Sequence, residues 1–371
     1  MEGTKPRTAS SIGMFDMLKG AGMLTIVFAH TAELYPMQAV SGLSLTAFFP
    51  FIYREALMAA FFIASGYGFR KRSIHKCIHQ QLKSLLKPYA YTALFTCVLH
   101  FIIHYKTFQY LPGTIGESIK VTGGFLLGLP HTAKYFGQEF FSCGPMWYLL
   151  ALMVGWVLLD VILNIFPERY VPWAVAGCVL LGWGASLVWE LPFCLIQGAV
   201  VVPYLYIGFL AKKKHLLDEP LPLKVFAGLL AATALIAVGA LATRTTDCIS
   251  LAEWSLGPLS IFLDGAAGLL FIRLFMRLSR GHGPIVHFLE AVGRRSLNIF
   301  CVHTVEIIAI PWYLMVAKFS AQPVLGMWLQ YAIALGSIWL VCELLRVRRA
   351  LIIRFFPAQR RTPAVHYTSR H

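Results

Sequence analysis

The chain has 371 residues, of which 58% are hydrophobic and only 13% charged, and its formal net charge is +15. This composition excludes an ordinary soluble domain, because it supplies many apolar runs of about twenty residues, the length that crosses a hydrocarbon core of about 30 Å. The positive charge does not indicate a nucleic-acid partner, since the basic residues stand in short clusters at the ends of apolar runs. We therefore predict an all-α, polytopic transmembrane helical bundle in a lipid bilayer.

The apolar runs predict about ten membrane spans and one shorter segment. The spans are expected at residues 15–36, 46–69, 86–105, 145–165, 171–189, 192–211, 223–243, 256–279, 296–317 and 325–345. The shorter segment, 118–130, is predicted to be a re-entrant or surface helix. No repeat at a fixed period is visible, so residues 15–346 are expected to form one membrane domain. A cytoplasmic segment 1–14 would precede it, and a disordered tail 347–371 would follow it.

Clusters of Lys and Arg predict the orientation, because such clusters mark the cytoplasmic ends of spans. They occur at residues 5–19, 70–87, 212–214, 273–295 and 346–354. All of them lie on one side of the membrane only if the number of spans is even. Both termini are therefore predicted to be cytoplasmic, in a multi-pass protein of a cell membrane that we expect to be the bacterial inner membrane.

The first predicted span carries four ionisable residues, Asp16, Lys19, His30 and Glu33. A charge near the centre of a spanning helix costs roughly 2.5–3.5 kcal/mol on insertion scales, so such residues usually face a cavity or a partner. On a helix, Lys19 and His30 lie within about 20° of the same face and about 16 Å apart along the axis. Either they are anchors near the two ends of the span, or one helical stripe presents a cation at the cytoplasmic mouth and an imidazole deeper in the membrane.

The second predicted span ends in small residues that are followed at once by a basic cluster. Ser65 and Gly66 belong to a stretch that allows close helix approach. Arg70 and Arg72 come next, and arginine is suited to bidentate phosphate binding. The same cluster would also serve as a topology signal.

Two later features also have two interpretations each. Trp147 begins the span at 145–165, where an interfacial aromatic residue is expected in any case. His303 and Glu306 repeat the spacing of His30 and Glu33 inside another span. The two pairs could be metal ligands, because residues at i and i+3 share a helix face, or they could be hydrogen-bonded pairs inside the bundle. We favour the second interpretation and expect no metal.

The eight cysteines show no C-x-x-C spacing, so a structural zinc site is not expected. Cys143 and Cys248 both fall in loops that the topology places outside the cell, where an oxidising compartment would allow a disulfide between them.

The order and spacing of these motifs resemble the membrane acyltransferase-3 family over nearly the whole chain, from Asp16 to His303. The family's usual arginine is Lys19 here, as in the branch that resembles fucose O-acetylases. The matching residues are Asp16, Lys19 and His30; Phe61, Phe62, Ser65 and Gly66 of an F-F-x-x-S-G segment; Arg70 and Arg72; Trp147; and a late span from Leu297 to His303.

The resemblance implies an O-acyltransferase that moves an acyl group, expected to be acetyl, from cytoplasmic acetyl-CoA to a hydroxyl of a cell-surface carbohydrate such as an envelope polysaccharide. His30 would act as general base, because its pKa near 6.5 lets it take and return a proton at neutral pH. Glu33 or Asp16 would orient it. The CoA phosphates would be bound by Lys19, Arg70 and Arg72, and the acceptor would be contacted by Ser65, Trp147, His303 and Glu306.

Two other classes of function stay open. A transporter or flippase could use the same ionisable residues as a proton relay, although no inverted repeat favours it. A non-catalytic scaffold or sensor is the other, and the intact Asp16, His30 and His303 argue against it. The identity of the acyl group and the acceptor and the oligomeric state cannot be predicted from the sequence.

Overall fold

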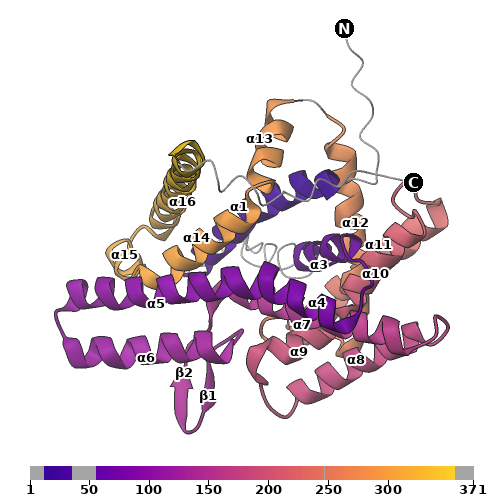
Figure 1. The fold of residues 1–371 in the computed structure, drawn as a ribbon, viewed down its shortest axis with the longest axis horizontal. Helices are drawn as coiled ribbons and strands as arrows, with labels where there is room; N and C mark the ends of the chain where they lie inside the picture. Colours follow the sequence, from indigo (N-terminus) through magenta and orange to yellow (C-terminus); the bar gives the residue numbers. More distant parts are fainter. Residues whose placement is uncertain (1–11, 36–55, 246, 282, 356–371) are drawn as a thin grey trace.

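The computed structural model describes residues 12–35, 56–245, 247–281 and 283–355. Nearly all regular structure in these ranges is helical (Figure 1). The α-helices are α1 (Asp16–Glu33), α3 (Met58–Tyr67), α4 (Ile74–Gln81), α5 (Lys87–Phe108), α6 (Leu111–Leu127), α7 (Trp147–Ile165), α8 (Val171–Ser186), α9 (Leu195–Val200), α10 (Val202–Lys213), α11 (Leu223–Thr243), α12 (Pro258–Leu278), α13 (Pro284–Gly293), α14 (Ser296–Ala309), α15 (Tyr313–Lys318) and α16 (Pro323–Phe355). Short helical turns are η1 (Ile12–Phe15), η3 (Leu82–Leu86), η4 (Gly144–Met146) and η5 (Pro192–Cys194).

The long apolar helices confirm an all-α, polytopic membrane protein. Within the described residues, five helices are long and apolar enough to cross a membrane: Ile74–Phe108, Gly144–Ile165, Leu223–Thr243, Pro258–Leu278 and Pro323–Arg348. A sixth is reached if α9 and α10, which meet at an angle of 50°, count as one broken span. The count of about ten spans stays a prediction. Helix α1 contains three charged residues, Asp16, Lys19 and Glu33, whereas the apolar stretches of the five long helices contain at most two each, and α3, α8 and α14 are shorter than a full span.

The predicted span at 46–69 lies partly outside the described residues, which resume at residue 56. The same holds for residues 1–11 of the predicted N-terminal segment and for residues 356–371 of the predicted tail. The last helix runs on to Phe355, past the predicted end of the last span. Residues 347–355 are therefore helical, and the prediction of a disordered tail can apply only beyond them.

Close helix contacts in the core depend on glycine. A Cβ atom added at Gly66 of α3 would collide with the backbone of Leu205, and one at Gly208 of α10 would collide with the carbonyl of Ile63. The two helices therefore touch backbone to backbone, which only a residue without a side chain permits. This contact confirms the close approach that the small residues around Gly66 predict.

The short segment predicted at 118–130 belongs to a longer helix, α6, which lies beside α5 (Figure 1). The hydroxyl of Tyr89 on α5 donates a hydrogen bond of 2.6 Å to the carbonyl of Phe125 on α6. After α6 the chain forms a small antiparallel hairpin, β1 (Ala133–Tyr135) and β2 (Gln138–Phe140), with Ala133 opposite Phe140. Hydropathy alone missed the first turns of α6, where Pro and Gly dilute the apolar signal.

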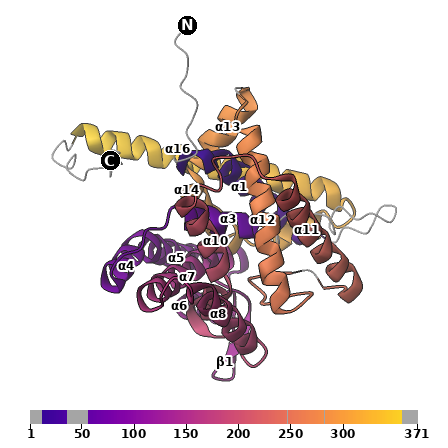
Figure 2. The same cartoon turned by 90° about the vertical axis from the view of Figure 1, so that its right-hand side faces the viewer.

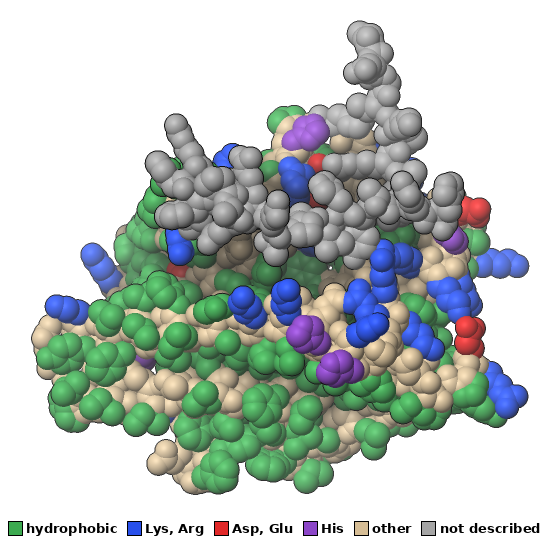
Figure 3. Space-filling view, viewed as in Figure 1, with side chains coloured by type: hydrophobic (Ala, Val, Ile, Leu, Met, Phe, Trp, Pro, Cys, Tyr) green, Lys and Arg blue, Asp and Glu red, His purple; other side chains and the backbone are tan. Residues whose placement is uncertain are grey.

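The surface of the bundle separates apolar from basic regions. Figure 3 shows hydrophobic side chains covering α5 and α6, and Lys and Arg gathered toward the α4 side of the molecule. Large apolar side chains such as Leu94, Phe95 and Leu126 are more than half exposed there, as expected of a surface that faces lipid. Figure 2 shows α11 beside α12 at the edge of the bundle.

Candidate active site

The side chains that carry chemistry lie at two ends of the bundle. The carboxylate of Asp160, near the end of α7, accepts a hydrogen bond of 2.9 Å from the backbone N–H of Arg72. Trp147, at the start of the same helix, is thirteen residues away, or about 20 Å along the axis. We call the end that carries Arg70, Lys71 and Arg72 the basic end, and the end that carries Trp147 the cavity end.

A cavity of about 160 Å³ opens at the cavity end. It is smaller than the roughly 300–1,000 Å³ of a typical drug-sized site, so it would admit a small group rather than a whole cofactor. Its walls come from α1, α3, the η4–α7 junction, α14 and the loop before α12. The lining residues are Ile26, His30, Glu33, Met58, Pro145, Trp147, Tyr148, Cys248, Ile249, Ser250, Leu251 and Phe300.

Two histidine–carboxylate pairs meet beside this cavity. Nδ1 of His30 lies 3.5 Å from Oε2 of Glu33, and Nδ1 of His303 lies 2.9 Å from Oε2 of Glu306. The centroids of the two imidazole rings are 5.6 Å apart. The structure thus brings together the two His-x-x-Glu motifs, although they stand on helices far apart in the sequence.

The two pairs differ in how deeply they are buried. The side chains of His303 and Glu306 are 2% and 6% exposed, whereas those of His30 and Glu33 are 23% and 45% exposed. His30 lines the cavity and can be reached from it. His303 does not line the cavity, and its Nε2 has no hydrogen-bond partner among the described residues.

The Glu306 contact selects the tautomer of His303. An ionised carboxylate only accepts hydrogen bonds, so the ring nitrogen facing it must carry the proton. A neutral His303 therefore keeps Nδ1–H toward Glu306 and presents a lone pair at Nε2, the form that accepts a proton. Within the described ranges, no set of three or more His, Cys, Asp or Glu side chains is gathered closely enough to hold a metal ion.

Ser65 is connected to the cavity through Tyr148. The hydroxyl of Ser65 donates to the carbonyl of Phe61 at 2.9 Å, so it accepts from the Tyr148 hydroxyl at 3.2 Å. The Tyr148 ring packs on Phe62, with ring centroids 4.6 Å apart. Trp147 lines the cavity directly rather than serving only as an interfacial belt residue.

Asp16 and Lys19 lie at the other end of α1 from the cavity. Their side chains pair with each other, Nζ to Oδ1, at 3.5 Å. Asp16 is fourteen residues before His30, about 21 Å along the helix, so it is too far away to orient that imidazole. Of the two candidates for this role, only Glu33 contacts His30.

Arg70 and Arg72 lie at the basic end and do not line the cavity. Arg70 is exposed and Arg72 is half-buried, with its backbone held by Asp160 and by the side chain of Asn164. The glycine contact between α3 and α10 places Lys212 close by, with its Nζ 5.8 Å from the ring centroid of Tyr67. The sequence offered Lys212 only as part of a topology signal, and its closeness to Tyr67 depends on the packing of α10 against α3.

The disulfide that an oxidising compartment would allow between Cys143 and Cys248 is not formed. Both are free, buried thiols. Cys248 lines the cavity, and its sulfur lies 3.3 Å from Oγ of Ser250. Cys143 lies instead beneath the α6–β1 connection, where its N–H donates to the carbonyl of Leu129 at 2.8 Å.

Several cavity residues were not expected from the sequence. Phe300 stands one turn before His303 on α14, so helical spacing could have found it. The loop segment Cys248–Leu251 carries no periodic signal, and only the tertiary structure brings it to the cavity.

The comparison with known families agrees with this geometry. Residues 12–347 match the family model described as acyltransferase domain, of the acyltransferase-3 type. No curated protein and no solved structure matches the chain. The match covers the basic end, the cavity end and the cavity itself, and it indicates acyltransferase activity. The chain therefore belongs to the acyltransferase-3 family of membrane proteins.

Proposed function

We propose that this protein is an O-acyltransferase that moves an acetyl group from cytoplasmic acetyl-CoA to a hydroxyl of a carbohydrate at the cell surface. The observation that carries the proposal is the cavity beside two histidines, each with its Nδ1 within 3.5 Å of a carboxylate oxygen. This arrangement supplies a base in a small, partly apolar site. Acyl transfer to a hydroxyl requires such a base, because the acceptor must lose its proton as it attacks.

His30 is proposed as the general base, because it lines the cavity and His303 does not. Its Nε2 takes the proton of the acceptor hydroxyl, whose oxygen bonds to the carbonyl carbon of the thioester. The carbon–sulfur bond then breaks, and the CoA thiolate takes the proton back. Glu33, at 3.5 Å from Nδ1, stabilises the imidazolium that forms in between.

His303 and Glu306 are proposed to bind the acceptor beside His30, together with Trp147 and, through Tyr148, Ser65. The lone pair that Glu306 directs to Nε2 of His303 is suited to accepting a hydrogen bond from a hydroxyl. The two rings are close enough that one small acceptor group could lie against both.

The basic end is proposed to face the cytoplasm and to bind the phosphates of CoA. Arg70 and Arg72 provide planar guanidinium groups, and Lys19 lies at the same end of α1 as Asp16. The pantetheine arm would then run through the bundle toward His30, since the cavity itself is too small for the nucleotide. A transporter function is not favoured by the family match.

The test is acceptor-dependent release of free CoA from acetyl-CoA by the purified protein, with a panel of sugars. We expect His30→Ala to lower the rate by about 10²–10⁴-fold, the usual contribution of a general base. His79→Ala, which changes an exposed histidine on α4, is the matched control and should keep the wild-type rate. Equal rates in the wild type and His30→Ala would remove His30 from the mechanism. A protein that fails to bind acetyl-CoA would favour transport instead.

A further inference from the structure

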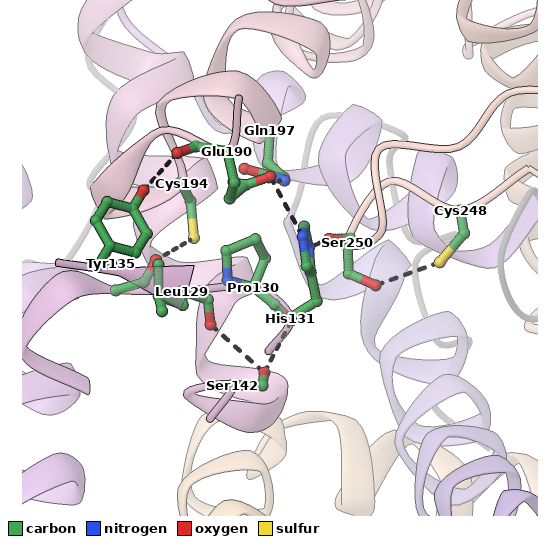
Figure 4. Close-up of polar contacts among 11 residues, drawn as sticks. Leu129, Pro130, His131, Tyr135, Ser142, Glu190, Cys194, Gln197, Cys248 and Ser250 are labelled. Carbon is green, nitrogen blue, oxygen red and sulfur yellow. Dashed lines mark hydrogen bonds and ion pairs between the residues drawn. The ribbon is translucent and has the colours of Figure 1, made fainter. Parts of the chain in front are cut away.

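A single imidazole at the cavity end contacts two other connecting segments of the chain. His131 lies in the α6–β1 connection, Glu190 in the connection between α8 and η5, and Ser250 in the loop between α11 and α12. Figure 4 shows the His131 ring between the other two. Its Nδ1 lies 3.0 Å from the backbone oxygen of Ser250, and its Nε2 lies 3.6 Å from Oε2 of Glu190.

The chemistry of these contacts determines where the protons are. A carbonyl oxygen only accepts hydrogen bonds, so Nδ1 of His131 must be the donor to Ser250. Nε2 then faces a carboxylate oxygen, and that contact is attractive only if a proton lies on the imidazole or on Glu190. His131 therefore links the backbone of Ser250 to the carboxylate of Glu190, and we call these two contacts the clamp.

Glu190 is itself held from two further elements. The amide of Gln197, a fully buried residue of α9, donates to Oε1 of Glu190 at 3.4 Å, and the hydroxyl of Tyr135 on β1 donates to its backbone oxygen. Two other titratable groups, Tyr135 and Cys194, interact electrostatically with Glu190. Cys248 lies in the same loop as Ser250, and its sulfur is next to the Ser250 hydroxyl. Gln197 and Tyr135 thus hold Glu190 in place, and His131 connects Glu190 to the loop that contains Ser250.

The loop segment Cys248–Leu251, which His131 contacts at Ser250, forms part of the cavity wall. Cys248, Ile249, Ser250 and Leu251 line the same cavity as His30 and Glu33. His131 does not line the cavity, so it acts on the cavity only through the backbone of Ser250.

We propose that His131, held by Glu190, is a positioning residue that fixes the segment Cys248–Leu251 as the acceptor-side wall of the cavity and so determines which hydroxyl acceptors fit beside His30. This proposal rests on the proposed function for the nature of the ligand, but the position of the wall is testable without activity. Loosening the clamp should release the segment and expose Cys248, which is only 6% exposed when the wall is in place.

The experiment measures the rate at which N-ethylmaleimide alkylates Cys248 in the full-length protein, by mass spectrometry of its peptides. We expect His131→Ala to raise the rate about tenfold, as for the loss of one part-buried hydrogen bond of about 1.4 kcal/mol. Glu190→Gln should raise it by less, since the Ser250 contact remains. His131→Asn, whose side-chain amide can still donate to Ser250, should restore most of the protection.

Two controls keep the outcome specific. Cys77 is buried at the opposite end of the molecule, with its sulfur against the carbonyl of Trp156, and its alkylation should not change. Glu139→Gln alters an exposed carboxylate on β2 of the hairpin that follows His131, and it should leave Cys248 protected. A rate at Cys248 unchanged by His131→Ala, or an equal rise at Cys77, would overturn the proposal.

Kinetics then separate the two proposals. If the protein transfers acyl groups, His131→Ala should raise KM for the acceptor and leave KM for acetyl-CoA unchanged. A rise in both would mean that the clamp does not act on the acceptor side. If no acyl transfer occurs with any variant, the proposed function fails, while exposure of Cys248 would still show that His131 positions the wall.

Discussion

The imidazole rings of His30 and His303 lie 5.6 Å apart, and each has its Nδ1 within 3.5 Å of a carboxylate three residues further along its own helix. The His303 pair is shorter and more deeply buried than the His30 pair. The two glutamates should therefore differ in how strongly they constrain their histidines.

The first prediction concerns Glu306. Glu306→Gln should lower kcat/KM for the acceptor more than Glu33→Gln does, because a buried amide that donates to Nδ1 of His303 would move the ring proton to Nε2 and remove the lone pair that accepts a hydrogen bond from the acceptor. The loss at Glu306 is expected to be at least about tenfold. Steady-state CoA release for both variants measures it. A larger loss for Glu33→Gln would place the more important contact on α1.

The second prediction concerns the contact between α3 and α10. Gly208→Ala should lower the free energy of unfolding by about 1–3 kcal/mol, because the new methyl group would collide with the carbonyl of Ile63. Thermal unfolding of the purified protein in detergent checks this. Gly177→Ala on α8 is the matched control, because a Cβ there meets nothing within 4 Å and should cause no loss. Equal stability of the two variants would contradict the close contact.

The third prediction concerns the donor. Arg70→Ala should raise KM for acetyl-CoA several-fold, because the exposed guanidinium would contact phosphate. The effect should shrink as ionic strength rises, since exposed charges are screened over about 8–10 Å. Lys224→Ala, which removes an exposed charge from α11, is the control. An unchanged KM in Arg70→Ala would exclude this residue from donor binding.

The fourth prediction concerns pH. Burial raises the pKa of Glu190 above its ordinary value of 4.5, although the neighbouring His131 opposes the shift. A carboxyl whose pKa is raised on folding stabilises the protein fully below pH 4.5, and this stability is lost as pH rises through the folded-state pKa. Thermal stability of the wild type should therefore fall across that window, and Glu190→Gln should flatten the fall. Glu139→Gln should leave it as it is, and a wild-type profile that rises there would refute the assignment.

The sequence predicted the local parts of the site better than their assembly. His30 with Glu33 and His303 with Glu306 could be predicted as contacts, because residues at i and i+3 are neighbours on any helix. That the two pairs face each other depends on how α1 and α14 pack, and no spacing along the chain contains that information. Asp16 was interpreted as a possible partner of His30, but helical rise alone places it about 21 Å away.

The loops were the least predictable part. His131 and Ser250 are 119 residues apart, and neither lies in a periodic segment, so their hydrogen bond had no signature in the sequence. The helical elements were predicted where apolar runs are long, as at α7 and α12, and poorly where Pro and Gly interrupt them, as at α6.

The backbone contact between α3 and α10 has a consequence for how the protein tolerates different membranes. Helices adapt to bilayers of different thickness by tilting, and separate helices would tilt independently. Because Gly66 and Gly208 hold these two in register, they should tilt as one body. Arg70 and Lys212 would then keep their mutual distance in thick and thin bilayers alike, so that recognition of a polyanionic ligand at this end would be insensitive to lipid chain length.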